Sequence, residues 1–227
     1  MTALPNDQPL SAPVEDYLKA IYQLAGPSGP ASTNDIAAAL ALAPASVSGM
    51  VRRLAEQGLI AHERYRGVRL TPAGRRAALR TIRRHRVIEA YLTRALGYSW
   101  DRVHDEAERL EHAASDELID RMAAAMGEPA TDPHGAPIPT REGELEEPSL
   151  TPLSALSAGE RAVVRRVDDR DPSRLRYLAE LGLLPGRELE VTERAPFEGP
   201  ITVSVGAGTL RVIGATLADG VLVSRAQ

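Results

Sequence analysis

Histidine and carboxylate side chains are unusually dense in residues 104–117, which read HDEAERLEHAASDE. Imidazole nitrogens and carboxylate oxygens are common protein ligands of divalent transition metals. On a helix, steps of three and four residues place side chains on one face, and like charges that meet there repel by roughly 0.2–0.5 kcal/mol. A bound cation reverses that repulsion, so the stretch predicts a metal site. The residues on the predicted stripe are His104, Glu108, Glu111, His112 and Ser115.

A second pair of the same kind lies upstream at His85 and Glu89, four residues apart, and the first predicted helix offers a further carboxylate at Asp16. Helical spacing places the upstream pair on one face. Such sets resemble those that carboxylate-rich helical bundles direct at metal ions. A single histidine is more often an ordinary surface or core residue, and we interpret His62 and His134 in that way.

The composition fits a globular protein that buries a sizeable core. The chain has 227 residues, of which 43% are hydrophobic, enough for one large domain or two to three small ones. It contains no cysteine, which excludes disulfides, zinc–thiolate sites and cysteine nucleophiles. The N-terminus lacks the pattern of a secretory signal, and no apolar run is long enough to cross a bilayer. These features predict a cytoplasmic protein without a membrane partner.

The net charge of −4 is unevenly distributed along the chain. Residues 1–96 hold 13 Lys and Arg against 7 Asp and Glu, residues 97–126 hold 3 against 8, and residues 127–227 hold 11 against 16. A basic first part suits an anionic polymer, and an acidic second part suits cations. Solvated charged faces are an equally ordinary explanation for any single run.

Local patterns in the first part predict three helices followed by a hairpin. Apolar residues at helical spacing mark residues 14–25 and 32–42, and Pro44 opens a third helix. Two strand-like runs follow in residues 59–65 and 68–71. A helix pair with a two-stranded wing is a winged helix-turn-helix, whose second helix enters the major groove of DNA.

Small and basic side chains lie where such a fold meets DNA. Small polar residues at the start of the third helix permit close approach, and guanidinium groups suit phosphates. No Asn or Gln lies near that start, which predicts a large share of shape and water-mediated readout. The same elements also build protein-interaction modules, but the basic charge favours DNA. The candidate DNA-binding residues are Ser46, Ser48, Arg52, Arg53, Arg64, Arg66 and Arg69.

The remainder of the chain predicts a helical block, a linker and a small β module. A helix of residues 72–96, which Thr71 caps, is followed by one that Ser99 or Asp101 caps, and by another from about Ser115. Residues 128–152 are rich in Pro, Gly and Glu, as in linkers. Short β-type runs then indicate a small barrel or sandwich with one helical insert. The runs are residues 162–167, 188–192, 201–205, 210–213 and 221–223.

Together, these segments resemble the diphtheria toxin repressor family of metal-dependent regulators, in particular its manganese-responsive branch. The matching stretches cover nearly all of residues 14–140 in order, and they are specific together although each alone is weak. The tail stretch LAELGLLPGRELEV is similar to the SH3-like C-terminal domain of long family members. The other matching stretches are VEDYLKAIYQL, PASVSGMVRRL, ERYRGVRLTPAG, RRHRVIEAYL, VHDEAERLEHAASDEL and PHGAPIP.

The resemblance implies a homodimer that binds a palindromic double-stranded DNA operator when Mn²⁺ or Fe²⁺ is bound, with Co²⁺, Zn²⁺ or Cd²⁺ as substitutes. It implies neither a membrane partner nor a small organic substrate. It also implies metal ligands at the matching positions. The principal site matches Asp16, Glu108, Glu111 and His112. The ancillary site matches His85, Glu89 and His104, and the tail domain offers Asp168 and Asp169 as further ligands.

Two departures from the family pattern bear on the metal. Iron-responsive relatives place Met and Cys where this chain has Asp16 and Glu108. Hard oxygen ligands favour Mn²⁺, while Fe²⁺ remains compatible. Short manganese regulators have Glu where this chain has Lys19, and an ammonium group cannot bind a metal. Two separated sites are therefore expected rather than one bridged pair.

We expect a mainly α N-terminal half, formed by a winged helix-turn-helix and a helical dimerisation domain, followed by a small all-β SH3-like domain. The expected function is a metal-dependent regulator of metal-uptake genes, and the resemblance implies a repressor. A metal-independent regulator that senses an organic ligand is the alternative, and a metalloenzyme is disfavoured because no nucleophile or phosphate loop accompanies the histidines. The expected divisions are residues 1–12 as disordered tail, 13–73 as DNA-binding domain, 74–127 as metal-binding and dimerisation domain, 128–152 as linker and 153–227 as SH3-like (FeoA-like) domain.

In the expected mechanism, a metal held by the first helix and by residues 104–117 fixes the DNA-binding half against the dimerisation half. Two recognition helices then reach successive major grooves, roughly 34 Å apart. We expect the dimer to form through apolar side chains between residues 97 and 126. These are Val103, Ala107, Leu110, Leu118 and Met122.

Overall fold

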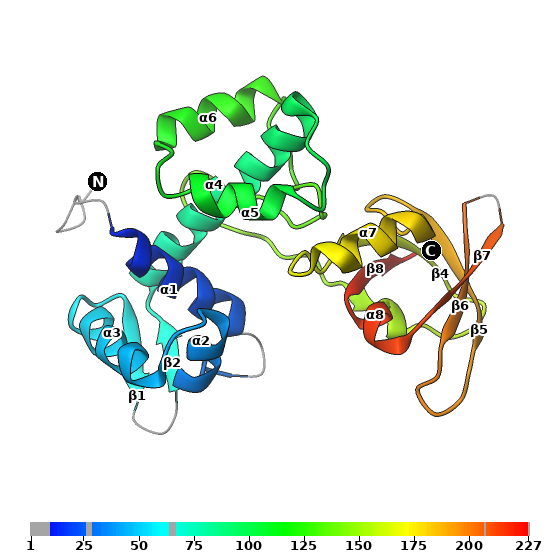
Figure 1. The fold of residues 1–227 in the computed structure, drawn as a ribbon, viewed down its shortest axis with the longest axis horizontal. Coiled ribbons are helices and arrows are strands. Elements are labelled where there is room, and N and C mark those ends of the chain that lie inside the picture. Colours follow the sequence, from blue (N-terminus) through cyan, green and yellow to red (C-terminus); the bar gives the residue numbers. More distant parts are fainter. Residues whose placement is uncertain (1–9, 26–28, 64–66, 207, 227) are drawn as a thin grey trace. The chain divides into compact units, whose positions relative to one another are not determined.

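Figure 1 shows the ribbon of the computed structural model, which describes residues 10–25, 29–63, 67–206 and 208–226. Most of the predicted disordered tail lies outside the described residues. The chain divides into two compact units, one formed by Met1–Arg83 and Pro139–Leu145 and the other by Arg84–Ile138 and Glu146–Gln227. The division falls within a long helix, which therefore contributes to both units.

The first unit contains the predicted helix-turn-helix with a β-hairpin. Its elements are α1 (Ala12–Leu24), α2 (Thr33–Ala39), α3 (Pro44–Glu56), β1 (Ile60–Glu63) and β2 (Gly67–Leu70). Ser32 caps α2 by accepting a hydrogen bond from the Asp35 amide. Leu18, Ile36 and Leu54 are fully buried where the three helices pack together. This packing leaves the opposite face of α3 exposed to solvent.

Thr71 joins the hairpin to the long helix α4 (Pro72–Leu96). Its hydroxyl donates to the Gly58 carbonyl at 2.7 Å and accepts from the Gly74 amide at 3.1 Å. Only glycine fits at position 74 without a shift, because a Cβ there would lie 1.9 Å from the Leu59 carbonyl oxygen. The predicted capping of α4 by Thr71 is confirmed.

The second unit begins within α4 and continues through α5 (Val103–Leu110) and α6 (Asp116–Ala125), drawn in green in Figure 1. The helix predicted to begin near Ser115 is α6, and the Ser115 hydroxyl caps it by accepting from the Leu118 amide at 3.2 Å. Apolar faces of α4, α5 and α6 form a small separate core. That core holds the helices that carry the histidines and acids.

Two predictions about α5 are wrong. Arg102 holds its N-cap position in place of Ser99 or Asp101, and it makes no side-chain cap hydrogen bond. In addition, α5 ends at Leu110, so the last residues of the predicted helical stripe lie in the turn that follows. Ser115 takes an extended conformation and caps the next helix, so one continuous helix through the stripe is excluded.

Part of the predicted linker is a packed loop. The Asp132 carboxylate accepts from the amides of His134 and Ala136, both at 2.9 Å, which closes a tight turn. Gly135 has a φ of +88°, and a Cβ there would lie 1.8 Å from the Arg165 carbonyl oxygen. The loop therefore needs glycine to approach the C-terminal sheet this closely.

The C-terminal part is a six-stranded antiparallel sheet in the order β3-β8-β4-β5-β6-β7, with helices at its side (Figure 1). Its elements are β3 (Thr151–Pro152), η1 (Leu153–Ala155), β4 (Arg161–Val167), α7 (Pro172–Leu181), β5 (Glu188–Arg194), β6 (Ile201–Val205), β7 (Thr209–Ile213), α8 (Ala215–Asp219) and β8 (Val221–Arg225). All five predicted strands and the helical insert are present, whereas β3 and α8 were not predicted. The expected fold class is confirmed.

Strand β4 carries a bulge at Arg165. Its pairing with β8 shifts between Val164 and Arg166, so Arg165 is an extra residue in the ladder. Val164 and Val167 consequently both face the core, although regular alternation would turn one of them outward.

Among the described residues, no single helix has the length and apolar character needed to cross a bilayer. The helices α2 and α3 have the required length and apolar character only when they are counted as one segment, and a bend of 111° separates them.

Candidate metal centre

His85 lies at the centre of a group of histidines and acids in the second unit. Its Nδ1 lies 2.6 Å from Glu111 Oε2. Its Nε2 lies 3.0 Å from Glu89 Oε1 and 3.2 Å from His104 Nδ1. The contact between His85 and Glu89, one turn apart on α4, confirms that they share a face. Three of these four side chains are almost fully buried, and His104 is the exception.

The first cluster consists of His85, His104 and Glu108, whose ligand atoms all lie within 4.8 Å of one another. Glu108 Oε1 is 3.6 Å from His85 Nδ1 and 3.8 Å from His104 Nε2. The Glu108 side chain is 40% exposed, so the cluster opens to solvent on that side. It brings together α4 and α5 with two nitrogen donors and a carboxylate, a set that suits a divalent transition metal.

The second cluster consists of Glu89, His134 and Asp169, whose ligand atoms also lie within 4.8 Å of one another. His134 Nδ1 is 3.8 Å from Glu89 Oε2 and 3.8 Å from Asp169 Oδ2. These residues come from α4, from the packed loop and from the segment that follows β4. The two clusters meet at Glu89, because its other oxygen contacts His85 and His104.

Buried side-chain atoms beside the second cluster show that a cation fits there. Among the described residues, Glu89 Oε2 and His134 Nδ1 are buried and make no hydrogen bond, and neither does Asp132 Oδ2 nearby, although it lies 3.6 Å from Arg86 Nε. A buried polar atom without a partner costs about 1–3 kcal/mol, and native structures contain few of them. Coordination to one ion would satisfy donors of these types. The residues present therefore fit a metal.

Burial and neighbouring charges shift the pKa values of Glu89, Asp132 and His134. Burial raises the pKa of Glu89, but His85, His104 and His134 outweigh burial and hold it well below its usual range. Burial lowers the pKa of His134, but Glu89 and the other carboxylates outweigh burial and raise it to about 9. Burial and Glu89 raise the pKa of Asp132 to about 6. Without a metal, a proton on His134 supplies the positive charge that the carboxylates need.

The predicted principal site is partly assembled within the second unit. Glu111 is fully buried, and its Oε1 lies 3.4 Å from His112 Nε2 in the turn after α5. Glu108 lies with the first cluster, beside two predicted ancillary ligands. Asp16 is half-buried on α1 in the first unit, and its part in the principal site stays a prediction from the sequence.

Sequence reasoning missed His134, which we had interpreted as an ordinary core or surface residue. A usable signal was Asp132 two residues earlier in a loop rich in Pro and Gly, because such loops bring backbone and side-chain donors together. Of the two ligands weakly predicted in the tail domain, one lies in a metal cluster and the other does not. Asp169 joins the second cluster, whereas Asp168 accepts from Arg170 Nε at 2.8 Å, and Arg170 lowers the Asp168 pKa.

The predicted DNA-reading residues lie on the exposed face of α3, opposite buried apolar residues. The exposed side chains are those of Ser46, Ser48, Arg52 and Arg53. Ser48 Oγ donates to the Pro44 carbonyl at 3.0 Å, which holds that side chain against the helix. Arg69 is exposed on β2, whereas Arg64 and Arg66 lie outside the described residues.

A winged helix with an exposed recognition helix, in one chain with a unit that gathers histidines and carboxylates, defines a DNA-binding protein with a metal-binding part. Residues 9–68 match the family described as “Iron dependent repressor, N-terminal DNA binding domain”. Residues 71–140 match “Iron dependent repressor, metal binding and dimerisation domain”, and residues 151–225 match “FeoA domain”. The chain belongs to the diphtheria toxin repressor family of metal-dependent transcriptional regulators.

Individual relatives agree with that membership. The chain is 39% identical over 110 residues to the HTH-type transcriptional regulator MntR of Lysinibacillus sphaericus, a match that covers 48% of this chain and 78% of the relative. It is 29% identical over 200 residues to the diphtheria toxin repressor of Corynebacterium diphtheriae, covering 84% and 87% of the two chains. A solved manganese-dependent transcriptional repressor in complex with manganese is 40% identical, with a TM-score of 0.87 and coverage of 94% of this chain and 100% of that one. The resemblance inferred from the sequence is confirmed.

Proposed function

We propose that the protein is a manganese-dependent repressor whose homodimer binds a palindromic operator when its histidine–carboxylate clusters hold Mn²⁺. It acts in the cytoplasm on genes of metal uptake. The observation that carries the proposal is the meeting of two clusters at Glu89 in a chain that also exposes a recognition helix. The relatives described above include a manganese-dependent repressor, which supports the choice of metal.

The proposed ligands are nitrogen and oxygen donors without sulfur, which favour Mn²⁺ and remain compatible with Fe²⁺. A bound Mn²⁺ supplies two positive charges that offset the carboxylates gathered around it. To the residues assigned from the sequence, the second cluster adds His134. The proposed set is Asp16, His85, Glu89, His104, Glu108, Glu111, His112, His134 and Asp169.

The proposed switch couples metal occupancy to DNA binding. Asp16 belongs to the unit that carries the recognition helix, and the other ligands belong to the second unit. Ligands supplied by both units would bias the protein towards one arrangement, in which two recognition helices fit successive major grooves roughly 34 Å apart. An organic effector would leave the histidines and carboxylates of the two clusters without a purpose.

Fewer of the apolar residues proposed from the sequence are available for the dimer interface than expected. Val103 and Ala107 are fully buried inside their own subunit, so they cannot form a surface for a second copy. Leu110 and Leu118 are 39% and 44% exposed on α5 and α6. We place the dimer contact at these two leucines, which a Leu118→Glu variant tests by sedimentation.

The metal requirement is tested on DNA. Operator duplexes are first selected from random sequences in the presence of MnCl₂ and are then titrated by fluorescence anisotropy. Glu108→Ala and His85→Ala should weaken operator binding at fixed Mn²⁺ by roughly 5- to 150-fold, the usual range of such coupling. Glu106→Ala is the matched control, because Glu106 lies on the same helix and pairs with Arg109 outside both clusters. Undiminished specific binding by chelator-treated protein would contradict the proposal.

A further inference from the structure

Trp100 makes two contacts with His134 from the connection between α4 and α5. The His134 Nε2–H donates to the Trp100 carbonyl oxygen at 2.8 Å. The indole also stacks on the imidazole, with ring centroids 5.7 Å apart and planes inclined by 30°. His134 is thus held both at its edge and over its face, although Trp100 offers no metal ligand of its own.

The carbonyl contact decides which ring nitrogen faces the second cluster. A carbonyl oxygen only accepts hydrogen bonds, so the Nε2 that contacts it carries a hydrogen. In the neutral imidazole, the lone pair then lies on Nδ1, the atom that faces Glu89 and Asp169. Metal-bound histidines commonly have their second nitrogen fixed in this way, which sets both tautomer and ring orientation.

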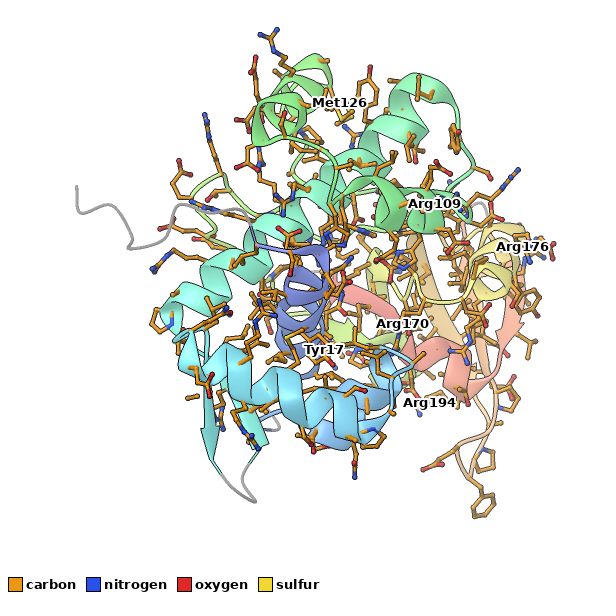
Figure 2. All side chains as sticks on the ribbon, turned by 60° about the vertical axis from the view of Figure 1, so that its left-hand side comes forward. Tyr17, Arg109, Met126, Arg170, Arg176 and Arg194 are labelled. Carbon is orange, nitrogen blue, oxygen red and sulfur yellow. The ribbon has the colours of Figure 1, made fainter. Side chains whose placement is uncertain are left out.

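The same residue contacts the SH3-like part of the second unit. The Trp100 side chain packs against the apolar core of that domain. The next residue, Asp101, accepts from Arg176 Nη1 at 3.0 Å, and Figure 2 labels Arg176 on α7. The connection is therefore anchored at two adjacent positions to the domain that also supplies Asp169.

We propose that Trp100 is the positioning residue of the second cluster. Its main-chain carbonyl fixes the tautomer of His134, its indole fixes the ring plane, and the same side chain ties that ligand to the SH3-like domain. The inference rests on the metal-binding role of His134 in the proposed function. It goes further by naming the residue on which that role depends and the domain through which it acts.

Metal titration of full-length variants tests the inference. Trp100→Leu keeps an apolar side chain against the SH3-like core but removes the aromatic face over His134. Chelator competition should show Mn²⁺ binding at the second cluster weakened about 10- to 100-fold, as for other partners of metal-bound histidines, and binding at the first cluster unchanged within about twofold. Trp100→Phe should restore most of the affinity. Tyr98→Leu is the matched control, because Tyr98 is an exposed aromatic residue in the same connection.

A spectroscopic readout separates positioning from general stability. Zn²⁺ serves as the diamagnetic probe for ¹⁵N NMR of the His134 ring. In the wild type, we expect the metal on Nδ1 and a slowly exchanging hydrogen on Nε2. The Trp100→Leu variant keeps the main-chain carbonyl but loses the indole that holds the ring against it, so that hydrogen should exchange about tenfold faster. If this variant does not fold, Arg176→Ala loosens the same connection through Asp101 without touching the core, and it should move exchange in the same direction.

The outcomes distinguish the inference from the proposed function. If His134→Ala binds as much metal as the wild type, His134 is no ligand, and the inference falls with that role. If the wild type loads the second cluster and Trp100→Leu loads it equally well with unchanged ring exchange, only the inference is overturned. Weaker loading with unchanged exchange of the Nε2 hydrogen would likewise overturn it, because the loss would then be structural.

Discussion

His85 Nδ1 lies 2.6 Å from Glu111 Oε2, and this contact joins α4 to the turn that follows α5. His85 is 5% exposed and Glu111 is fully buried, so the pair is almost shielded from water. A buried carboxylate depends on its partners far more than an exposed one does, because water cannot replace a lost hydrogen bond. The metal-free protein therefore uses its own candidate ligands as structural contacts.

Removal of His85 should destabilise the metal-free protein. The loss of one partner of a buried charge pair typically costs 3–5 kcal/mol, and we expect a loss of about 3 kcal/mol in the free energy of unfolding for His85→Ala. Urea unfolding in the presence of a chelator measures it. Arg121→Ala is the control, because its exposed pair with Glu117 should contribute less than about 1 kcal/mol. Equal losses for the two variants would show that His85 has no structural role.

Glu89→Gln should weaken metal binding at both clusters. One oxygen of Glu89 faces His85 and His104, and the other faces His134, so the loss of its charge reaches both groups. Asp169→Asn should weaken the second cluster alone. Metal stoichiometry and chelator competition on the two variants check this difference. Identical binding curves would show that Glu89 does not link the clusters.

The stability of the metal-free protein should fall between about pH 6.5 and pH 9. The carboxylates around His134 raise its pKa from 6.5 to about 9 against the effect of burial, so the folded state binds this proton more tightly than the unfolded state. The contribution of the group is complete below about pH 6.5 and is lost as the pH rises through about 9. Thermal unfolding across this range should show the loss, and His134→Gln should flatten that part of the profile. A profile that stays unchanged in this variant would contradict the assignment.

Gly135→Ala should be more harmful than Gly159→Ala, although both glycines have similar positive φ values of +88° and +86°. The backbone strain, about 1–2 kcal/mol, is common to both variants. A Cβ at position 135 would also meet the Arg165 carbonyl oxygen at 1.8 Å, whereas nothing lies within 4 Å of one at position 159. Thermal unfolding and Mn²⁺ titration should both show the additional loss in Gly135→Ala. Matching losses would mean that the loop moves away without cost.

Elements that local chemistry determines were predictable from the sequence. Thr71 caps the helix that it was expected to cap, because one side chain and the next turn suffice for that contact. The five predicted strands follow from alternation of apolar residues between turn residues. The shared face of His85 and Glu89 follows in the same way from helical spacing.

The remaining features depend on contacts between distant segments. The spacing of the acids after Leu110 fits a helix equally well, but α5 ends at Leu110 and Ser115 is extended as the cap of the next helix. His134 joins Glu89 because the loop closed by Asp132 packs against the sheet at Gly135, which no local pattern shows. The Pro-rich composition of the loop suggested a spacer, but proline and glycine also build tight, buried turns.

The bulge in β4 sets the register of everything that follows it. Arg165 is one residue more than the neighbouring strand can pair. Each residue after it therefore faces the opposite side of the sheet from the one that it would face in a strand without a bulge. If Arg165 paired with Leu222 in a continuous ladder instead, Val167 would turn outward and Asp169 would lie on the opposite side of the sheet from His134. The bulge therefore lets a strand of this length present Asp169 to the ion. Deletion of Arg165 removes the extra residue and leaves the pairing of Val167 with Val221 unchanged, so metal titration of that variant should show the ligand retained.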